Sequence, residues 1–253
     1  MSTVAKEVVV VIGPGSIGRA IARRVGSGRI LLLAAHNEKA TEDAAEQLRG
    51  DGFEVALQTA DISDREAVEA LADKAAAMGP VTRVIHAAGV SPTQASIERV
   101  LEVDLVGTAY ILDAFARVIA PGGAGIVVAS MAGHRESPYE REIEQALATT
   151  PTAELLALPF LQSEKIGSSV HAYALAKRAN SLRVLTAAAA WGKRGARVNA
   201  ISPGVIITPL ALDELSGPRK EWFEHVRKVC AAQRFATSDE QERLQRRLDE
   251  PST

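Results

Sequence analysis

Short continuous apolar runs alternate along the chain with longer amphipathic stretches of helical periodicity. Strands of a parallel sheet give such runs because helices cover both faces of the sheet. The pattern therefore predicts an α/β fold with a doubly wound parallel sheet. The predicted strands are residues 8–12, 30–34, 54–58, 83–86, 125–129 and 197–201.

Amphipathic helices are predicted between these strands, and residues that stop helices follow the first three. Gly26 and Gly50 end the first and second, and Gly79-Pro80 ends the third. The predicted helices are residues 17–25, 38–49, 64–78, about 97–119 and about 170–190. This order places the turn after the first strand where a doubly wound fold binds its nucleotide.

Two stretches interrupt the alternation. Residues 134–165 are predicted to form a helical insertion, a flap of two helices, in which Ser137-Pro-Tyr-Glu140 has the capping-box pattern and Thr150-Pro151 opens the second helix. The apolar residues 155–161 could line a pocket or only anchor the helices, and anchoring is the commoner use.

The second stretch is at the C-terminal end. Residues 231–253 form a divergent polar tail with one predicted helix, 239–250, and no strand after it.

Composition narrows the class of partner. The 253 residues fit a single domain, and 29 basic against 31 acidic side chains give no electrostatic reason to expect nucleic acid or an anionic membrane. The apolar runs are too short to cross a bilayer, the N-terminus lacks the apolar stretch of a signal peptide, and the single cysteine, Cys230, fits a reducing compartment. We therefore expect a cytoplasmic protein that binds a small molecule.

The turn after the first strand reads Gly13-Pro14-Gly15-Ser16-Ile17-Gly18, which satisfies G-x-G-x-x-G. The motif is informative here because it follows an apolar strand and opens a helix. Glycines in this place let the backbone approach a pyrophosphate held at the helix N-terminus. We therefore expect a Rossmann-type dinucleotide site rather than only a tight turn.

Tyr173 and Lys177 are four residues apart in a predicted helix, so they share one face, where the ammonium favours the ionised phenol. A Tyr-x-x-x-Lys pair alone is a weak signal. Ser130 ends a predicted strand at the carboxyl edge of the sheet, where ligands of such folds bind. Taken alone, Ser130 is equally well explained as a turn or N-cap serine.

The histidines show no metal-binding spacing, so no metal is expected.

Together these segments resemble the short-chain dehydrogenase/reductase family over roughly residues 7–215. The resemblance implies an NAD(P)-dependent oxidoreductase that transfers a hydride between nicotinamide and a secondary alcohol or carbonyl. It implies that Tyr173 exchanges the proton, that Ser130 holds the reacting oxygen and that Lys177 holds the ribose. The implied cofactor-binding residues are Gly13, Ser16, Ile17, Gly18, His36, Asn37, Asp61, Ile62, Ala88, Gly89, Tyr173, Lys177, Pro203, Gly204 and Thr208.

The chain departs from the family at several places. Asp104 stands at the remaining catalytic position, where the family commonly has an Asn that holds a relay water. A carboxylate could hold water, but its charge disfavours the tyrosinate. The long segment between Ser130 and Tyr173 is similar to that of the 3α-hydroxysteroid dehydrogenase/carbonyl reductase branch, and the insertion could be a lid or a subunit contact. The glycine-rich final strand of the family, which contributes to tetramer contacts, is either missing or divergent in this sequence, yet a homodimer or homotetramer is still expected.

Cofactor choice depends on the residues after the second strand. Ala35 stands where an acidic residue would repel a 2′-phosphate, and His36 stands where NADP-using relatives often have Arg. NADP is therefore expected, with NAD possible, although His36 could equally be a solvated surface residue.

A second class of function stays open. A cofactor-binding regulatory or scaffold protein with lost or weak turnover would also explain Asp104, the His86-Ala87 pair in the turn after the fourth strand, and the short tail. The intact Ser130, Tyr173 and Lys177 set favours the enzyme.

Overall fold

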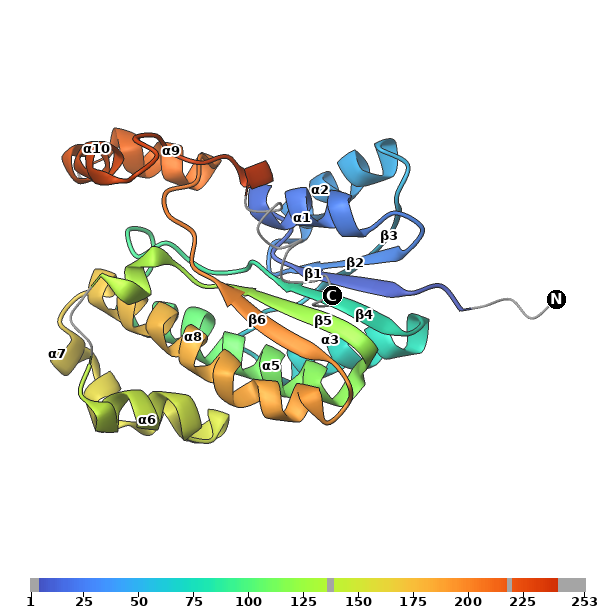
Figure 1. Ribbon diagram of the computed structural model, residues 1–253, viewed down its shortest axis with the longest axis horizontal. Helices are drawn as coiled ribbons and strands as arrows, with labels where there is room; N and C mark the ends of the chain where they lie inside the picture. Colours follow the sequence, from blue (N-terminus) through green and yellow to red (C-terminus); the bar gives the residue numbers. More distant parts are fainter. Residues whose placement is uncertain (1–4, 136–138, 218–219, 241–253) are drawn as a thin grey trace.

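The computed structural model describes residues 5–135, 139–217 and 220–240, and in this part of the chain it has one six-stranded sheet. The strands are β1 (Val8–Ile12), β2 (Ile30–Ala35), β3 (Glu54–Thr59), β4 (Val81–His86), β5 (Ile119–Val128) and β6 (Arg197–Ile201). All neighbours are parallel, in the order β3-β2-β1-β4-β5-β6 (Figure 1). From β1 to β3 the chain adds strands on one side of β1, and from β4 to β6 it adds them on the other side. A doubly wound sheet has its ligand crevice where this direction changes, which here is between β1 and β4. The predicted fold class is confirmed.

Helices cover both faces of the sheet. The helices α1 (Ser16–Val25) and α2 (Glu38–Gly50) lie on one face, and α3 (Arg65–Met78), α5 (Thr108–Val118) and α8 (Ser169–Gly192) lie on the other (Figure 1). Alternate residues of β1 enter the two cores: Val8 and Val10 pack on the α3 side, whereas Val9 and Val11 pack on the α1 side. The uninterrupted apolar run of this strand is therefore required by burial on both faces.

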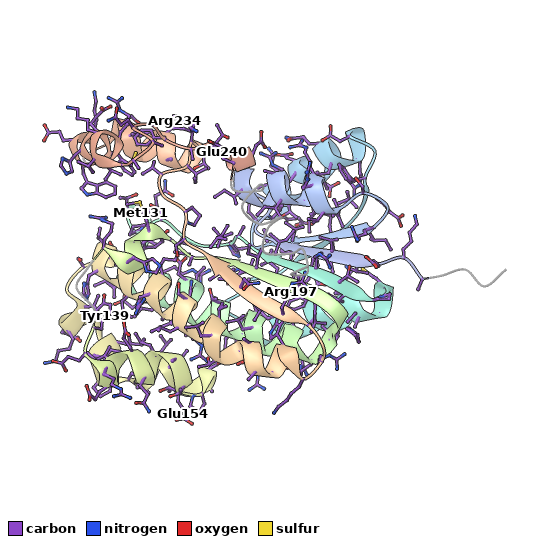
Figure 2. All side chains as sticks on the ribbon, in the orientation of Figure 1. Met131, Tyr139, Glu154, Arg197, Arg234 and Glu240 are labelled. Atoms are coloured by element: carbon purple, nitrogen blue, oxygen red, sulfur yellow. The ribbon has the colours of Figure 1, made fainter. Side chains whose placement is uncertain are left out.

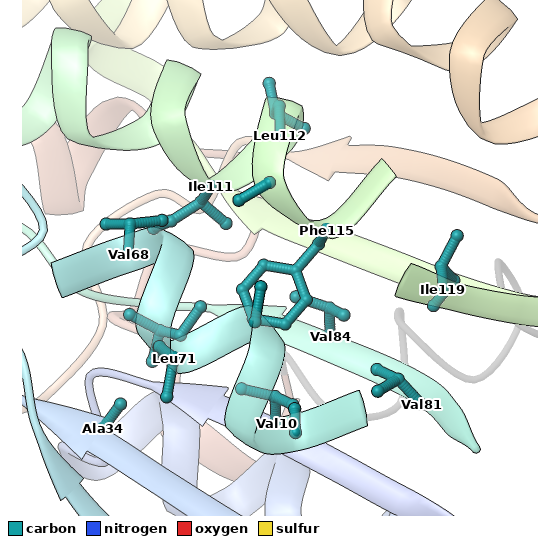
Figure 3. Packing of buried hydrophobic residues seen from close by; sticks show 14 of the residues in the cluster. Val10, Ala34, Val68, Leu71, Val81, Val84, Ile111, Leu112, Phe115 and Ile119 are labelled. Carbon is teal, nitrogen blue, oxygen red and sulfur yellow. The ribbon is translucent and has the colours of Figure 1, made fainter. Parts of the chain in front are cut away.

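The core on the α3 side fixes the position of α5. Figure 3 shows Phe115 of α5 between Val84 of β4 and the α3 residues Val68 and Leu71. Phe115 is fully buried, and burial of such a side chain contributes about 1.5–3 kcal/mol. The same packing holds the segment that precedes α5 against the carboxyl end of β4.

The predicted helix 97–119 is helical over most of its length but is not one α-helix. It consists of α4 (Ile97–Val100), a π-helical stretch η1 (Leu101–Gly107) and α5. Ile119 instead begins β5, so the prediction of a strand from residue 125 is wrong by six residues. The start of β5 was hidden because Pro121, Gly122 and Gly123 read as a turn, and the ladder to β4 is irregular there.

The insertion contains one regular α-helix, α6 (Arg141–Thr149), followed by the 3₁₀ turns η3 (Thr152–Ala157) and η4 (Pro159–Leu161) and the short α7 (Ser163–Ile166). The second helix predicted to open at Thr150-Pro151 is not an α-helix: a 3₁₀ stretch begins at Thr152, and Pro159 prevents it from continuing as one helix. The predicted capping box includes residues 137–138, which lie outside the described residues. Leu155 and Leu161 are buried in one cluster with residues of α8, so these two serve as anchors, whereas Leu156 is exposed.

Two further helices, α9 (Pro209–Ser216) and α10 (Lys220–Val229), follow β6 and were not predicted. They lie over the carboxyl edge of the sheet (Figure 1). The predicted tail helix 239–250 lies outside the described residues beyond residue 240. Within the described residues, no helix has the length and apolar character needed to span a bilayer.

Candidate active site

A cavity of about 350 Å³ lies at the carboxyl ends of the central strands. Its walls come from the turns after β1, β4, β5 and β6, together with α8 and α10. All four predicted catalytic residues line it: Asp104, Ser130, Tyr173 and Lys177. They come from three segments far apart in the sequence, which the parallel topology brings to one edge.

The glycine turn after β1 is packed directly against the turn after β4. Gly13 has φ +82°, and a Cβ there would lie 2.4 Å from the backbone nitrogen of Ala88. A Cβ on Gly18 would lie 2.3 Å from the carbonyl oxygen of Gly13. Only glycine therefore allows the two turns and the start of α1 to approach this closely.

The N-terminus of α1 is open on the side where a dinucleotide would lie. Gly15 is its N-cap, no described side chain caps it, and no described atom lies within 4 Å of a Cβ built on Gly15. The first N–H groups of the helix, which begins at Ser16, are thus available to an anion. These residues fit a pyrophosphate group, and Ile17 of the same turn lines the cavity.

Lys177 and Asp104 form a buried ion pair in the cavity wall. Lys177 Nζ lies 2.8 Å from Asp104 Oδ1, and the two side chains are 5% and 0% exposed. Burial is the largest influence and acts to lower the pKa of Lys177, but the charge of Asp104, the interaction with Tyr173 and the hydrogen bond to Asp104 together outweigh it, so the pKa is raised. The ammonium also lies 5.3 Å from the centroid of the Tyr173 ring. Lys177 is therefore charged, paired with a carboxylate and positioned over the Tyr173 ring.

The π-helical stretch holds Asp104 in a fixed position. Asp104 Oδ2 accepts a hydrogen bond of 3.1 Å from the backbone N–H of Val90, in the turn after β4. The Thr108 hydroxyl donates to the Asp104 carbonyl at 2.8 Å and is itself 2.9 Å from His86 Nε2. Burial, followed by the charge of Lys177, lowers the pKa of His86 to about 3, so this histidine is neutral. Both the carboxylate and the carbonyl of Asp104 thus have protein partners.

Ser130 and Tyr173 are half-buried residues of the cavity wall. Ser130 follows β5 and is the N-cap of the 3₁₀ turn η2 (Met131–His134), where its Oγ accepts from the N–H of Ala132 at 3.2 Å. The N-cap explanation and the catalytic one are therefore compatible, since the hydroxyl can still donate to a ligand. Gly133 packs so tightly on α8 that a Cβ would lie 2.6 Å from Arg178 N, which fixes this turn against the backbone of Lys177 and Arg178.

The loop after β6 forms the opposite wall of the cavity. Pro203, Gly204 and Thr208 all line it, as do Ala88 and Gly89 from the turn after β4. The Pro203 carbonyl accepts from Met131 N at 2.9 Å, and Thr208 Oγ1 accepts from Ala211 N and so caps α9. These hydrogen bonds join the loops after β5 and β6 around the cavity.

The remaining predicted cofactor residues lie at the ends of β2 and β3, away from the cavity lining. Asn37 caps α2 through its side chain, and the His36 side chain is 77% exposed with Nδ1 3.8 Å from Asp61 Oδ2. Asp61 also pairs with Arg99 at 2.8 Å. Burial raises the pKa of Asp61, but hydrogen bonds from Ser63 and the contact with Arg99 outweigh this, so the pKa is lowered.

Ile62 has its side chain in the core, where it packs on Gly107. Only its main chain is left for a cofactor.

Several cavity residues were not found from the sequence. Met131 lies between the end of β5 and the α9–α10 pair (Figure 2), and Trp222 and Phe223 of α10 also line the cavity. The Arg135 guanidinium lies 4.4 Å from the centroid of the Trp222 ring, a cation–π contact. Only the Trp-Phe pair at 222–223 could have indicated a ligand-covering helix. Within the described residues, no His, Cys, Asp and Glu side chains gather as a metal site.

Comparison with known proteins gives the family. A family model described as short chain dehydrogenase matches residues 6–141, and one described as Enoyl-(Acyl carrier protein) reductase matches residues 140–246. The chain belongs to the short-chain dehydrogenase/reductase family. The resemblance inferred from the motifs is confirmed, and with it the expectation of an oxidoreductase.

Individual relatives agree with this assignment. The short-chain dehydrogenase/reductase bsc3 of Alternaria brassicicola is 36% identical over 92% of this chain and 85% of its own length. A 3-alpha-hydroxysteroid dehydrogenase/carbonyl reductase of Comamonas testosteroni is 30% identical over 76% of both chains. A crystal structure of NAD⁺-bound xylitol dehydrogenase superposes with a TM-score of 0.73 at 22% identity, over 99% of this chain and 94% of that one, which shows the shared fold.

Proposed function

We propose that this protein is a carbonyl reductase or secondary-alcohol dehydrogenase that uses NADP(H). The observation that carries the proposal is the convergence of Ser130, Tyr173 and Lys177 on one cavity beside the open N-terminus of α1. A bound nicotinamide supplies or accepts the hydride. The chain itself provides the proton, the orientation of the reacting oxygen and the binding surface.

The proposed catalytic side chains have different tasks. The Tyr173 hydroxyl donates a proton to the substrate oxygen in reduction and takes it back in oxidation. The Ser130 hydroxyl hydrogen-bonds the same oxygen and stabilises the charge that develops on it. Lys177 stays charged, reaches toward Tyr173 and can also bind the ribose hydroxyls of a dinucleotide. Asp104 holds Lys177.

The preference for NADP rests on the adenosine end. His36 is largely exposed near the end of β2, and no carboxylate occupies position 35. A 2′-phosphate would thus meet a histidine that can be protonated and no acidic side chain at position 35. Asp61 lies nearby, but its charge is offset by Arg99. NAD is the second choice on this reasoning.

The substrate is proposed to be a largely apolar carbonyl compound or alcohol. The cavity is at the small end of the range for ligand sites, and residues such as Met131, Val170, Ile206 and Trp222 make much of its wall apolar. A related hydroxysteroid dehydrogenase/carbonyl reductase is in keeping with such a substrate.

The first test is Tyr173→Phe, which removes the proton donor and keeps the ring. Turnover with a panel of ketones and hydroxysteroids should fall about 10²–10⁴-fold, while NADPH affinity, measured by fluorescence titration, stays within a few-fold of the wild type. Tyr139→Phe is the matched control, because this ring lies outside the cavity lining, 6.1 Å from the His171 ring. Turnover retained in Tyr173→Phe would contradict the assignment.

A cofactor-binding regulatory or scaffold protein is the alternative, and Asp104 at the Asn position is what favours it. Wild-type protein that binds NADPH but reduces no carbonyl in the panel would support this alternative.

We also propose a homodimer or homotetramer working in the cytoplasm. The exposed Leu185 on α8 and the edge strand β6 offer surface for self-association, and light scattering would give the mass.

A further inference from the structure

The ion pair in the cavity wall affects the direction of the reaction. Lys177 can favour ionised Tyr173 only through the field of its positive charge. Asp104 Oδ1 lies 2.8 Å from that charge, and both side chains are almost fully buried. Because solvent screens a buried pair weakly, the carboxylate cancels much of the field that Lys177 exerts on the phenol.

Asp104 is held in place by contacts on several sides. Its Oδ2 accepts from Val90 N, and Gly89 leaves just enough room, since a Cβ on Gly89 would lie 2.5 Å from Oδ1. Its carbonyl accepts from Thr108. The carboxylate cannot turn away from Lys177 without breaking the hydrogen bond from Val90 N.

Asp104 cancels much of the effect of the Lys177 charge on Tyr173, and no other positive charge in the described surroundings takes over that effect. His86 of β4 is neutral, and Arg135 after η2 is exposed and stacked on Trp222. Other titratable groups on or against α8 have partners of their own. Arg178 pairs with Glu144 of α6, and Arg183 donates to backbone carbonyls of the insertion. His134 of η2 contacts Ser202, and the His171 ring lies beside that of Tyr139.

We propose that Asp104 makes this protein a reductase at neutral pH, because by neutralising Lys177 it keeps the Tyr173 hydroxyl protonated and ready to act as an acid. The inference rests on the proposed function. In reduction the carbonyl carbon accepts a hydride from the reduced nicotinamide, the carbonyl oxygen takes the Tyr173 proton, and the tyrosinate regains a proton from water. Oxidation needs the tyrosinate at the start, so it becomes fast only at alkaline pH. Asp104 is thus a positioning residue that acts through Lys177.

Asp104→Asn tests the proposal, since it removes the charge and keeps the shape. The rising limb of the pH profile for alcohol oxidation should move down by about one pH unit, so that oxidation below that limb speeds up roughly tenfold. The matched control is Asp113→Asn on α5, whose carboxylate accepts from Thr152 and does not line the cavity. An unshifted oxidation profile in Asp104→Asn would overturn the inference.

Direct titration of the tyrosinate by ultraviolet difference absorbance gives a readout independent of turnover. Making Tyr173→Phe in the wild type and in Asp104→Asn, and subtracting each spectrum, isolates Tyr173 in both, and the half-ionisation pH should be lower in Asp104→Asn. If Asp104→Asn does not fold, the wild-type protein still tests the proposal, because its Tyr173 should give no tyrosinate absorbance at neutral pH. Ionisation near neutral pH would overturn the proposal.

Measurements of turnover show whether a negative result contradicts the proposed function or only this inference. Absence of turnover in both directions contradicts the proposed function. Turnover with an unmoved tyrosinate signal and profile contradicts only the role of Asp104.

Discussion

The two ends of the proposed cofactor site carry similar charged groups in opposite environments. At the catalytic end, Lys177 and Asp104 are 5% and 0% exposed. At the adenosine end, Arg99 and Asp61 are 34% and 31% exposed, and His36 is 77% exposed. Water screens the charges at the adenosine end and not those at the catalytic end. Equal distances, 2.8 Å in both ion pairs, therefore do not give equal effects.

Removing the cation from each pair should give the largest difference between the two ends. Lys177→Met leaves the Asp104 carboxylate buried without its partner, so the free energy of unfolding should fall by about 3–5 kcal/mol. Arg99→Met is the matched control at the adenosine end, where the loss should be at most about 1 kcal/mol. Urea unfolding of both variants measures the difference. Equal losses would show that burial does not separate the two ends.

Stability should also depend on pH through the buried histidine at the catalytic end. The folded protein keeps His86 neutral down to a pKa of about 3, whereas the unfolded chain takes up this proton near the ordinary value of 6.5. Stability is therefore lost as the pH falls from 6.5 toward 3, by up to a few kcal/mol.

His86→Asn, which has no such proton to bind, should lose less stability than the wild type between about pH 7 and pH 4. Urea unfolding at several pH values tests this. Parallel stability curves for the two proteins would show that His86 titrates normally.

The smallest effect is expected for His36→Ala at the adenosine end. Water screens the interaction of an exposed histidine with a phosphate, so the dissociation constant for NADPH should rise only about two- to fivefold. The constant for NADH, which lacks the 2′-phosphate, should not change. Fluorescence titration with both cofactors measures this, and equal weakening for the two would mean that His36 does not contact the phosphate.

Local features of the sequence predicted much of the fold. The apolar runs located the strands because a sheet covered on both faces demands them, although β4 was started two residues late and β5 six residues late, at a Pro-Gly-Gly turn that resembles a break. The insertion was recognised, but Pro159 divides what looked like a second helix. The helices α9 and α10 were missed, although Trp222 and Phe223 belong to the cavity wall.

The candidate catalytic side chains could be predicted from the sequence, because the four-residue spacing of Tyr173 and Lys177 is local, and so is the glycine turn that opens α1. How they act depends on the tertiary structure, since the partner of Lys177 comes from a distant π-helical stretch and Arg135 meets Trp222 only when α10 lies over the sheet edge. The residue types also do not show which charged side chains are buried. A carboxylate at position 104 is an ordinary charge in the sequence, and it acquires its strength only where packing has removed the water around it.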